Sequence, residues 1–361
     1  MNDSAATAVH RISADALSLA IEALFRHIGC SEEAAETITR HLLEANLTGH
    51  DSHGIIRVPR YVDAVMNGEI VPDRHARVVR ENPISMVVDG QRGFGQIIAE
   101  ETMGLLAAKT LRSGLAIAGI RNCGHLGRIG GWGEELARAK LVSLHFVNTT
   151  GKGMMVTPFG GSDRRLSLNP VCICVPREGR DPLLLDFTTA MCAEGKVAVA
   201  RNAGRSMPDG YLVDPQGQPT DDPEDFYAGG AVLPFGGYKG HGLNIMADIL
   251  AGGLSGGGMT QAGETVLTNT MTSIALDPAV MIDDMGAFEA ELERYVDWVK
   301  ASPPLQADQP VLAPGDPETS TRERRHATGI PVDAATWHQI MAAAEQAGMQ
   351  IDRFTRLAEF D

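Results

Sequence analysis

Residues 115–147 read LAIAGIRNCGHLGRIGGWGEELARAKLVSLHFV and contain three elements in succession. The apolar run at 115–120 predicts a strand, residues 132–139 predict a helix, and residues 141–147 predict a second strand. A glycine-rich turn around His125 joins the first strand to the helix. A strand, a helix and a strand in this order are typical of a βαβ-like unit, so we predict a three-layer α/β core.

The segments around this unit extend the predicted core to residues 76–280. Residues 97–112 have the spacing of a helix that leads into the first strand. Three further apolar runs predict buried strands, at 171–175, 183–185 and 271–276. The glycine-rich residues 252–258 predict a helix end followed by a loop.

The N-terminal residues 1–75 have a helical pattern. Ser13 is a predicted N-cap, and the apolar spacing after it ends at Gly29. A second helix is expected from Ser31 to about residue 47, and a third from Pro59 to about residue 68. His53 therefore lies in the break between two helices.

The C-terminal residues 281–361 are also expected to be helical and to pack with the N-terminal segment. Residues 288–300 form an amphipathic pattern, and Asp333 is a predicted cap for the last helix. Residues 303–321 between them predict a long polar connection.

Bulk composition excludes several classes of protein. The 361 residues are 43% hydrophobic and 21% charged, and the sequence has no apolar run long enough for a membrane span. The polar N-terminus lacks the apolar region of a secretory signal, and five cysteines without paired spacing fit a reducing compartment, so we expect a cytoplasmic protein. The net charge of −15 argues against nucleic acid as a partner.

Two histidines in turn-rich segments carry the functional hypothesis. His53 follows Ser52 and precedes Gly54, with Arg57 close behind, and His125 lies in a Gly-His-Leu-Gly turn. Histidine is the usual proton donor or acceptor near neutral pH. Arginine binds a carboxylate through two hydrogen bonds. This pairing predicts chemistry on a small carboxylic acid.

An acidic chain needs local cations to bind such an anion. Five basic residues occur in or beside loop-like motifs and can supply them: Arg57, Arg60, Arg128, Lys196 and Lys239. Ser52, Arg57 and Arg60 are our candidate substrate-binding residues.

Asp186 ends an apolar run and has two interpretations. A carboxylate at the end of a buried strand either orients an imidazole or caps the helix expected over 188–196. No histidine or cysteine cluster has metal-ligand spacing, so no metal site is expected.

The chain lacks both common nucleotide fingerprints, G-x-G-x-x-G and G-x-x-x-x-G-K-[ST]. A nucleotide must therefore be held by other glycine-rich loops, whose backbone N–H groups can approach phosphate. The candidate loops are Pro158–Gly161, Gly195–Lys196, Pro234–Gly240 and Pro314–Asp316.

Read together, these motifs resemble the malate/L-lactate dehydrogenase type 2 family, which includes sulfolactate dehydrogenases and cyclic-imine carboxylate reductases. The matching segments occur in family order and span nearly the whole chain: ANLTGHDSHG at 45–54, GHLG at 124–127, TPFGG at 157–161, NP at 169–170, LDFTT at 185–189, GK at 195–196, KG at 239–240 and LAPGD at 312–316.

The resemblance implies a mixed β-sheet in a non-Rossmann, sulfolactate-dehydrogenase-like fold with helical N- and C-terminal segments. It implies NAD or NADP as cofactor and a homodimer. By this resemblance, His53, His125 and Asp186 are catalytic candidates, and Arg57 is expected to bind the substrate carboxylate. The cofactor-binding candidates are Gly127, Arg128, Ile129, Pro158, Gly160, Leu184, Leu185, Asp186, Phe187, Thr188, Lys196, Tyr238, Lys239, Gly315, Asp316, Pro317 and Glu318.

Three functions stay open at this level. The first is an NAD(P)-dependent 2-hydroxy acid dehydrogenase or 2-oxo acid reductase, with His53 slightly favoured over His125 as the proton-transfer group. The second is a reductase of cyclic imine carboxylates, because the residues do not separate C=O from C=N. The third is a non-catalytic nucleotide-binding protein, suggested by departures from the family pattern at Ser167, Ala190 and His241.

Overall fold

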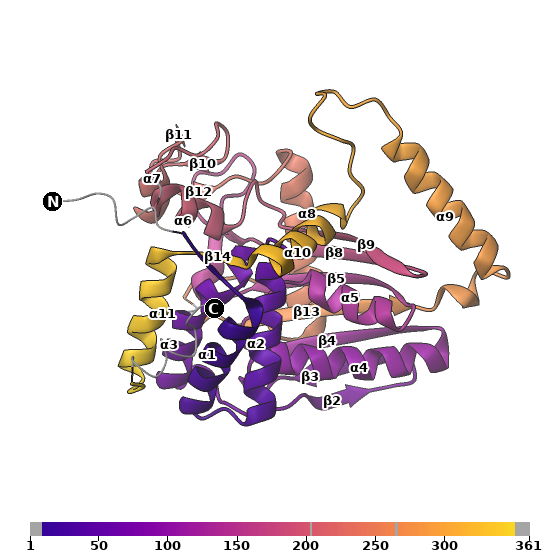
Figure 1. Cartoon of the computed structure of the whole chain (residues 1–361), viewed down its shortest axis with the longest axis horizontal. Helices are drawn as coiled ribbons and strands as arrows, with labels where there is room; N and C mark the ends of the chain where they lie inside the picture. The colour runs from indigo at the N-terminus through magenta and orange to yellow at the C-terminus, as the bar shows by residue number, and fades with distance from the viewer. Residues whose placement is uncertain (1–8, 203, 264–265, 351–361) are drawn as a thin grey trace.

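The computed structural model describes residues 9–350, except residues 203 and 264–265 (Figure 1). Its central element is a seven-stranded sheet with the strand order β2-β3-β4-β13-β5-β8-β9. Neighbouring strands are antiparallel apart from β3 and β4, which are parallel. The strands are β2 (Arg77–Glu81), β3 (Ser85–Asp89), β4 (Leu115–Cys123), β5 (Val142–Thr149), β8 (Val171–Arg177), β9 (Arg180–Phe187) and β13 (Asn269–Leu276).

The predicted βαβ-like unit differs from the structure in one respect. Strand β4, helix α5 (Gly130–Arg138) and strand β5 occur in the expected order. However, β13 lies between β4 and β5 and is antiparallel to both. The local pattern could not predict this insertion, because β13 enters the sheet about 120 residues further along the chain.

Helices cover both faces of the sheet, which confirms the predicted three-layer core around a mixed sheet. Helix α4 (Gly95–Ser113) and α5 pack against one face, over apolar side chains such as Val88, Ile120 and Met271. Helix α8 (Tyr238–Asp248) and the π-helix η4 (Ile249–Gly253) lie against the other face, where Thr272 Oγ1 donates to the Leu250 carbonyl at 2.7 Å.

The two ends of the described chain share a second core. Strand β1 (Val9–Ile12) pairs antiparallel with β14 (Ile330–Asp333). Around this pair lie four helices whose apolar side chains are buried together: α1 (Ala14–His27), α2 (Glu32–Leu47), α3 (Val58–Met66) and α11 (Ala334–Gln346).

Side-chain N-caps start three of these helices, and two of the caps, Ser13 and Asp333, were predicted. Ser13 Oγ accepts a hydrogen bond from Ala16 N at 3.2 Å, and Asp333 Oδ1 accepts one from Thr336 N at 2.8 Å. Ser31 Oγ likewise accepts from Ala34 N. Each cap satisfies a backbone donor that the first helical turn leaves free.

Two C-terminal helices depart from the expected pattern. The predicted polar connection over 303–321 is wrong at its end, because helix α10 spans Asp316–Thr328. This helix buries no side chain and so has no apolar period to detect. Helix α9 (Met285–Lys300) lies away from the N-terminal helices in Figure 1, and its Glu293 accepts from Arg177 at 2.6 and 2.7 Å. Residues 351–361 of the predicted C-terminal segment lie outside the described residues.

A smaller five-stranded sheet lies at one end of the core, in the order β11-β10-β12-β6-β7. Its strands have two or three residues each, too few for an alternating pattern to be visible. They are β6 (Met154–Val156), β7 (Leu166–Ser167), β10 (Leu212–Val213), β11 (Pro219–Thr220) and β12 (Ala231–Val232), with helices α6 (Glu194–Asn202) and α7 (Pro223–Tyr227) beside them.

Within the described part of the chain, no helix has both the length and the apolar content needed to cross a membrane.

A buried histidine in the sheet should make stability depend on pH. His145 is fully buried, its ring nitrogens lie 2.8 Å from Ser273 Oγ and 3.0 Å from Ser143 Oγ, and burial lowers its pKa to about 3. The unfolded chain takes up the proton near the ordinary value of 6.5, so the folded state loses stability as pH falls from 6.5 toward 3. Each such group contributes about 1.4 kcal/mol per pH unit in that range.

We therefore expect His145→Gln to make the fall in unfolding free energy between pH 6.5 and pH 4 shallower, as measured by urea denaturation. The exposed His338→Gln is the control and should leave the slope unchanged. An equal slope in wild type and His145→Gln would contradict the assignment.

Candidate functional site

A cavity of about 660 Å³ lies where the N-terminal helices meet the edge of the central sheet and the smaller sheet. Twelve predicted site residues line it: Ser52, His53, Arg57, Arg60, His125, Gly127, Arg128, Ile129, Asp186, Phe187, Thr188 and Lys196. They come from parts of the chain up to 144 positions apart, so the fold gathers them into one space.

A buried carboxamide holds the turn that carries His53. After α2 ends, two short 3-10 turns follow, η1 (Asp51–His53) and η2 (Ile55–Arg57). Asn46 Oδ1 accepts from Ile55 N at 2.9 Å, and Asn46 Nδ2 donates to Asp51 Oδ1 at 2.7 Å. A Cβ atom at Gly54 would lie 2.1 Å from Asn46 Oδ1, so only glycine fits in the Ser-His-Gly motif.

A second carboxamide holds the turn that carries His125. Asn269 Oδ1 of β13 accepts from Leu126 N at 2.8 Å, and Trp132 Nε1 donates to the Leu126 carbonyl at 3.1 Å. A Cβ atom at Gly95 would lie 2.3 Å from the His125 carbonyl oxygen, so the start of α4 packs directly beneath this turn.

The two imidazoles lie side by side in the cavity. Their ring centroids are 5.6 Å apart and their planes differ by 15°. His53 Nδ1 lies 2.9 Å from Ser52 Oγ, and His125 Nδ1 lies 2.8 Å from the Tyr61 hydroxyl. Each ring is therefore anchored through Nδ1, which leaves Nε2 as the nitrogen available to a ligand.

Both rings are neutral at ordinary pH. Burial, followed by the nearby Arg57 charge, lowers the pKa of His53 to about 3. The same two causes bring the pKa of His125 well below its ordinary value. A neutral imidazole can both donate and accept a proton, as proton transfer to or from a ligand requires.

The arginines are held close to these rings. Arg57 Nε donates to the Ser52 carbonyl at 2.5 Å, and its Nη2 lies 3.6 Å from Glu194 Oε2. Burial, followed by the charge of Arg57, lowers the pKa of Arg60. Two partly buried guanidinium groups beside two neutral imidazoles favour an anionic ligand.

Asp186 contacts a different group from either of the two that we predicted. Its Oδ2 accepts from Gly130 N at 2.6 Å, so it caps α5 and not the 188–196 segment, where α6 begins at Glu194. The start of α5 stabilises the negative charge, while burial raises the pKa of the carboxyl. Neither interpretation identified this helix, because β9 and α5 come together only in the folded chain.

Arg128 lines the cavity and carries a buried donor without a partner in the described part of the chain. Its side chain is 3% exposed, Nη2 pairs with Glu134, and Nη1 is buried without a hydrogen-bond partner among the described residues. A buried unpaired donor is costly, so this atom indicates a ligand acceptor.

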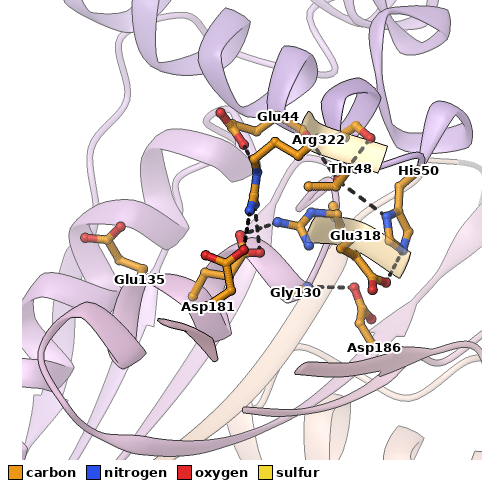
Figure 2. A network of polar contacts seen from close by, with 12 residues as sticks. Glu44, Thr48, His50, Gly130, Glu135, Asp181, Asp186, Glu318 and Arg322 are labelled. Carbon is orange, nitrogen blue, oxygen red and sulfur yellow. Dashed lines mark hydrogen bonds and ion pairs between the residues drawn. The ribbon is translucent and has the colours of Figure 1, made fainter. Parts of the chain in front are cut away.

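An ion-pair network holds α10 against the rim of the site (Figure 2). Arg322 lies 3.1 Å from Glu134 Oε1, 3.4 Å from Asp181 Oδ2 and 3.5 Å from Glu44 Oε2. On the same helix, Glu318 Oε1 is 3.7 Å from His50 Nε2. The network thus brings a C-terminal helix to residues that line the cavity.

Ten predicted cofactor residues lie outside this cavity lining. Leu184 is buried beneath α5, whereas Leu185 faces outward and is 42% exposed. Pro158, Gly160, Tyr238 and Lys239 lie around the start of α8, where Phe159 contacts Tyr238 edge to face. Gly315, Asp316, Pro317 and Glu318 lie at the start of α10, where Asp316 pairs with Lys300 at 2.6 Å.

Sequence reasoning missed several lining residues. His50, Glu194 and Asn269 carry polar groups into the cavity, and the apolar lining includes Met155, Leu168, Met191, Phe235 and Leu267. His50 lies three residues before His53 in the same loop, and this proximity was an available signal. The apolar lining residues could not be recognised from the sequence, because their pattern is the same as that of residues in a hydrophobic core. Within the described residues, no group of three or more metal-ligating side chains occurs.

Several known proteins are similar to this chain. A family model described as malate/L-lactate dehydrogenase matches residues 12–341. Hydroxycarboxylate dehydrogenase B of Escherichia coli K12 is 41% identical over 349 residues, which cover 94% of this chain and 95% of that protein. A solved Escherichia coli structure, provisionally described as a malate/lactate dehydrogenase, aligns with a TM-score of 0.92 at 40% identity, covering 97% of this chain and 99% of that one.

A relative named for a different activity is less similar to this chain. The structure of delta1-piperideine-2-carboxylate reductase from Pseudomonas syringae aligns with a TM-score of 0.81 at 29% identity, covering 92% of this chain and 99% of that one.

The contact between Gly54 and Asn46 allows a direct test. Gly54→Ala should displace the Asn46 carboxamide and destabilise the fold by about 1–3 kcal/mol, because the added methyl has no room. Gly104→Ala is the matched control: no atom lies near its Cβ position on α4, so stability should hold or rise slightly. Urea denaturation measures both, and equal stability of the two variants would contradict the steric argument.

Proposed function

The chain belongs to the malate/L-lactate dehydrogenase family, and we propose that it transfers a hydride between a nicotinamide cofactor and a 2-hydroxy or 2-oxo carboxylic acid. One observation carries this proposal: two neutral imidazoles and two arginines, Arg57 and Arg60, line the same cavity. Proton transfer at an oxygen and capture of a carboxylate are the two tasks that such an acid requires.

The residues present fit a dinucleotide. The cavity volume lies within the range of cofactor pockets, and the unpartnered Arg128 Nη1 is a donor suited to a phosphate or carboxamide oxygen. Gly127, Arg128, Ile129, Phe187, Thr188 and Lys196 would hold the cofactor from within the cavity. When bound, the nicotinamide ring supplies or receives the hydride. The proposed cofactor is NAD or NADP.

Eight of the ten cofactor residues outside the lining form two groups, and the other two are Leu184 and Leu185 of β9. The α10 group, Gly315 to Glu318, reaches the cavity through the contact between Glu318 and His50. The α8 group, Pro158, Gly160, Tyr238 and Lys239, lies beside Phe235, which lines the cavity. We propose that both groups contact the distal parts of the cofactor.

Arg57 and Arg60 bind the substrate carboxylate in this proposal, with Ser52 beside them. Binding an anion there also affects the imidazoles. The charge of Arg57 lowers the pKa of both His53 and His125. A carboxylate that offsets this charge therefore raises both pKa values toward the ordinary value of a histidine. Substrate binding therefore prepares a ring to carry a proton.

His53 is the proposed proton-transfer group, through Nε2. In oxidation the neutral ring accepts the hydroxyl proton as the hydride leaves, and in reduction it returns that proton to the carbonyl oxygen. Asp186 caps α5 at the cavity wall and acts in this proposal by holding the Gly127–Gly130 turn near the reacting atoms.

The imidazole variants test this role. His53→Ala and His125→Ala should each lower kcat by about 10²–10⁴-fold while far-UV circular dichroism stays unchanged. Arg57→Ala should mainly raise KM for the acid, because it removes a ground-state contact. The matched control is Arg324→Ala, an exposed arginine on α10 that should leave both constants unchanged. Near-normal turnover in both histidine variants would refute the assignment.

A substrate panel tests the reaction itself. It contains 2-oxo acids with linear, branched, aromatic and polyhydroxylated side chains, and cyclic imine acids, each with NADH and with NADPH. We expect turnover of at least one 2-oxo acid. Turnover of imines alone would support the alternative activity, which the lower identity to the Pseudomonas syringae reductase disfavours. Cofactor binding without any turnover would support a non-catalytic protein.

We also propose a homodimer, formed through the outer face of α8 and η4. This face presents Ile245, Met246, Ile249, Leu254 and Met259 to solvent. Asp248 is the sole charged residue from Gly240 to Gly263, and it is buried against Asn148 at 2.6 Å. For a chain with a net charge of −15, a charge-free apolar surface is where a second copy can approach with least repulsion.

A charge placed on this face should separate the subunits. We expect sedimentation velocity to give a dimer for wild type and a monomer for Met246→Glu. Met281→Glu, at an exposed methionine outside this face, is the control and should remain dimeric. A monomeric wild type, or a dimeric Met246→Glu, would contradict the proposed interface.

The state of the cysteines agrees with a cytoplasmic location, which we propose on that basis. All five cysteines are free and buried. Free thiols of this kind are typical of a reducing compartment.

A further inference from the structure

We infer that Tyr61, itself held by Gln96, is a positioning residue that fixes the neutral tautomer of His125 with its proton on Nε2. The consequence for catalysis rests on the proposed function. The tautomer itself follows from the hydrogen bonds and stands independently of which substrate is turned over.

The argument begins with a chain of three side chains. Gln96 Nε2 donates to the Tyr61 hydroxyl oxygen at 2.8 Å, and that oxygen lies 2.8 Å from His125 Nδ1. In this orientation of the amide, Gln96 Oε1 is buried without a partner among the described residues, so the bond to Tyr61 sets the direction of donation along the chain. Gln96 and Tyr61 are each 1% exposed, so no solvent competes for these atoms. A phenol has one hydrogen to donate.

Donor and acceptor roles then follow in order. Because the Gln96 amide donates to the phenol oxygen, the phenol hydrogen is free to point at His125 Nδ1. Among the described residues, that nitrogen is the remaining hydrogen-bond partner of Tyr61. Nδ1 therefore accepts, and the proton of the neutral ring must lie on Nε2.

Packing holds the phenol in place. The Tyr61 ring contacts the rings of Phe94 and Phe25, with centroids 5.9 and 6.5 Å away. Gln96 lies in the first turn of α4, the helix whose Gly95 supports the His125 carbonyl. The hydroxyl and the imidazole are thus positioned by the same helix start.

Burial keeps the ring in the neutral form to which this tautomer belongs. It lowers the pKa of His125 well below its ordinary value, and the charges of Arg57 and Arg60 act in the same direction. Burial likewise raises the pKa of Tyr61 to about 12, so the phenol keeps its hydrogen.

His53 is anchored in a different way. The partner of its Nδ1 is the Ser52 hydroxyl, which makes no second hydrogen bond among the described residues. A serine hydroxyl can rotate to donate or to accept, so His53 can change protonation state. The two rings therefore have different roles. His53 exchanges the proton with the substrate. His125 donates a fixed hydrogen bond from Nε2, which polarises the substrate C=O or C–O bond.

The direct test is the tautomer of His125 in the ligand-free protein. Nitrogen-15 NMR of histidine-labelled protein distinguishes a protonated from an unprotonated ring nitrogen, and His125→Gln assigns the signals. We expect wild-type His125 to have a protonated Nε2 and an unprotonated Nδ1. A proton on Nδ1 would overturn the inference, whether or not any variant folds.

Two variants test the cause. Tyr61→Phe and Gln96→Leu should move both His125 nitrogen shifts toward values intermediate between the two forms. The signals of His145, which is held by Ser143 and Ser273 elsewhere in the sheet, are the internal control and should stay unchanged. Unchanged His125 shifts in a folded Tyr61→Phe protein would overturn the role of Tyr61.

Kinetics separate positioning from simple structural support. Tyr61→Phe should lower kcat on the order of 10-fold with KM for the acid nearly unchanged, less than the 10²–10³-fold cost of removing an oxyanion donor outright. A raised KM with unchanged kcat would contradict the inference. If no substrate is turned over, the proposed function fails while the NMR result still decides the tautomer.

Discussion

The hydrogen bonds of two buried carboxamides hold the site together. Asn46 ties the turn of His53 to the end of α2, and Asn269 ties the turn of His125 to β13. Each carboxamide satisfies backbone groups that would otherwise be buried without partners. Because the two turns belong to different cores, the distance of 5.6 Å between the imidazoles depends on how these cores pack.

Burial creates the chemical character of the cavity. The imidazoles are neutral because desolvation and Arg57 disfavour their charged forms, and the guanidinium groups stay charged beside them. An anionic ligand reverses part of this balance by offsetting the arginine charge. In the proposed function, anion binding and proton transfer are therefore coupled through electrostatics. The Arg128 Nη1 donor is also buried, and no described residue accepts from it.

Polar contacts position the C-terminal helix that local pattern did not reveal. Helix α10 has no buried side chain, and it lies against the site through Arg322 and Arg325. Arg325 donates to both carboxylate oxygens of Asp51, at 2.6 and 2.9 Å, in the turn that carries His53. Such a helix is held in place by ion pairs and not by apolar packing, so its existence could not be predicted from hydrophobic periodicity.

The sequence by itself determined the helix caps at Ser13 and Asp333, the strands around 115–147, and the histidines and arginines of the site, because these depend on local spacing and side-chain chemistry. Tertiary structure alone decided the place of β13 in the sheet, the partner of Asp186, and the link from Gln96 through Tyr61 to His125. Each of these joins residues far apart in the chain. Tyr61 and Gln96 also lie on apolar-patterned helices, where a polar side chain is recognised as functional only once its hydrogen-bond partner is known.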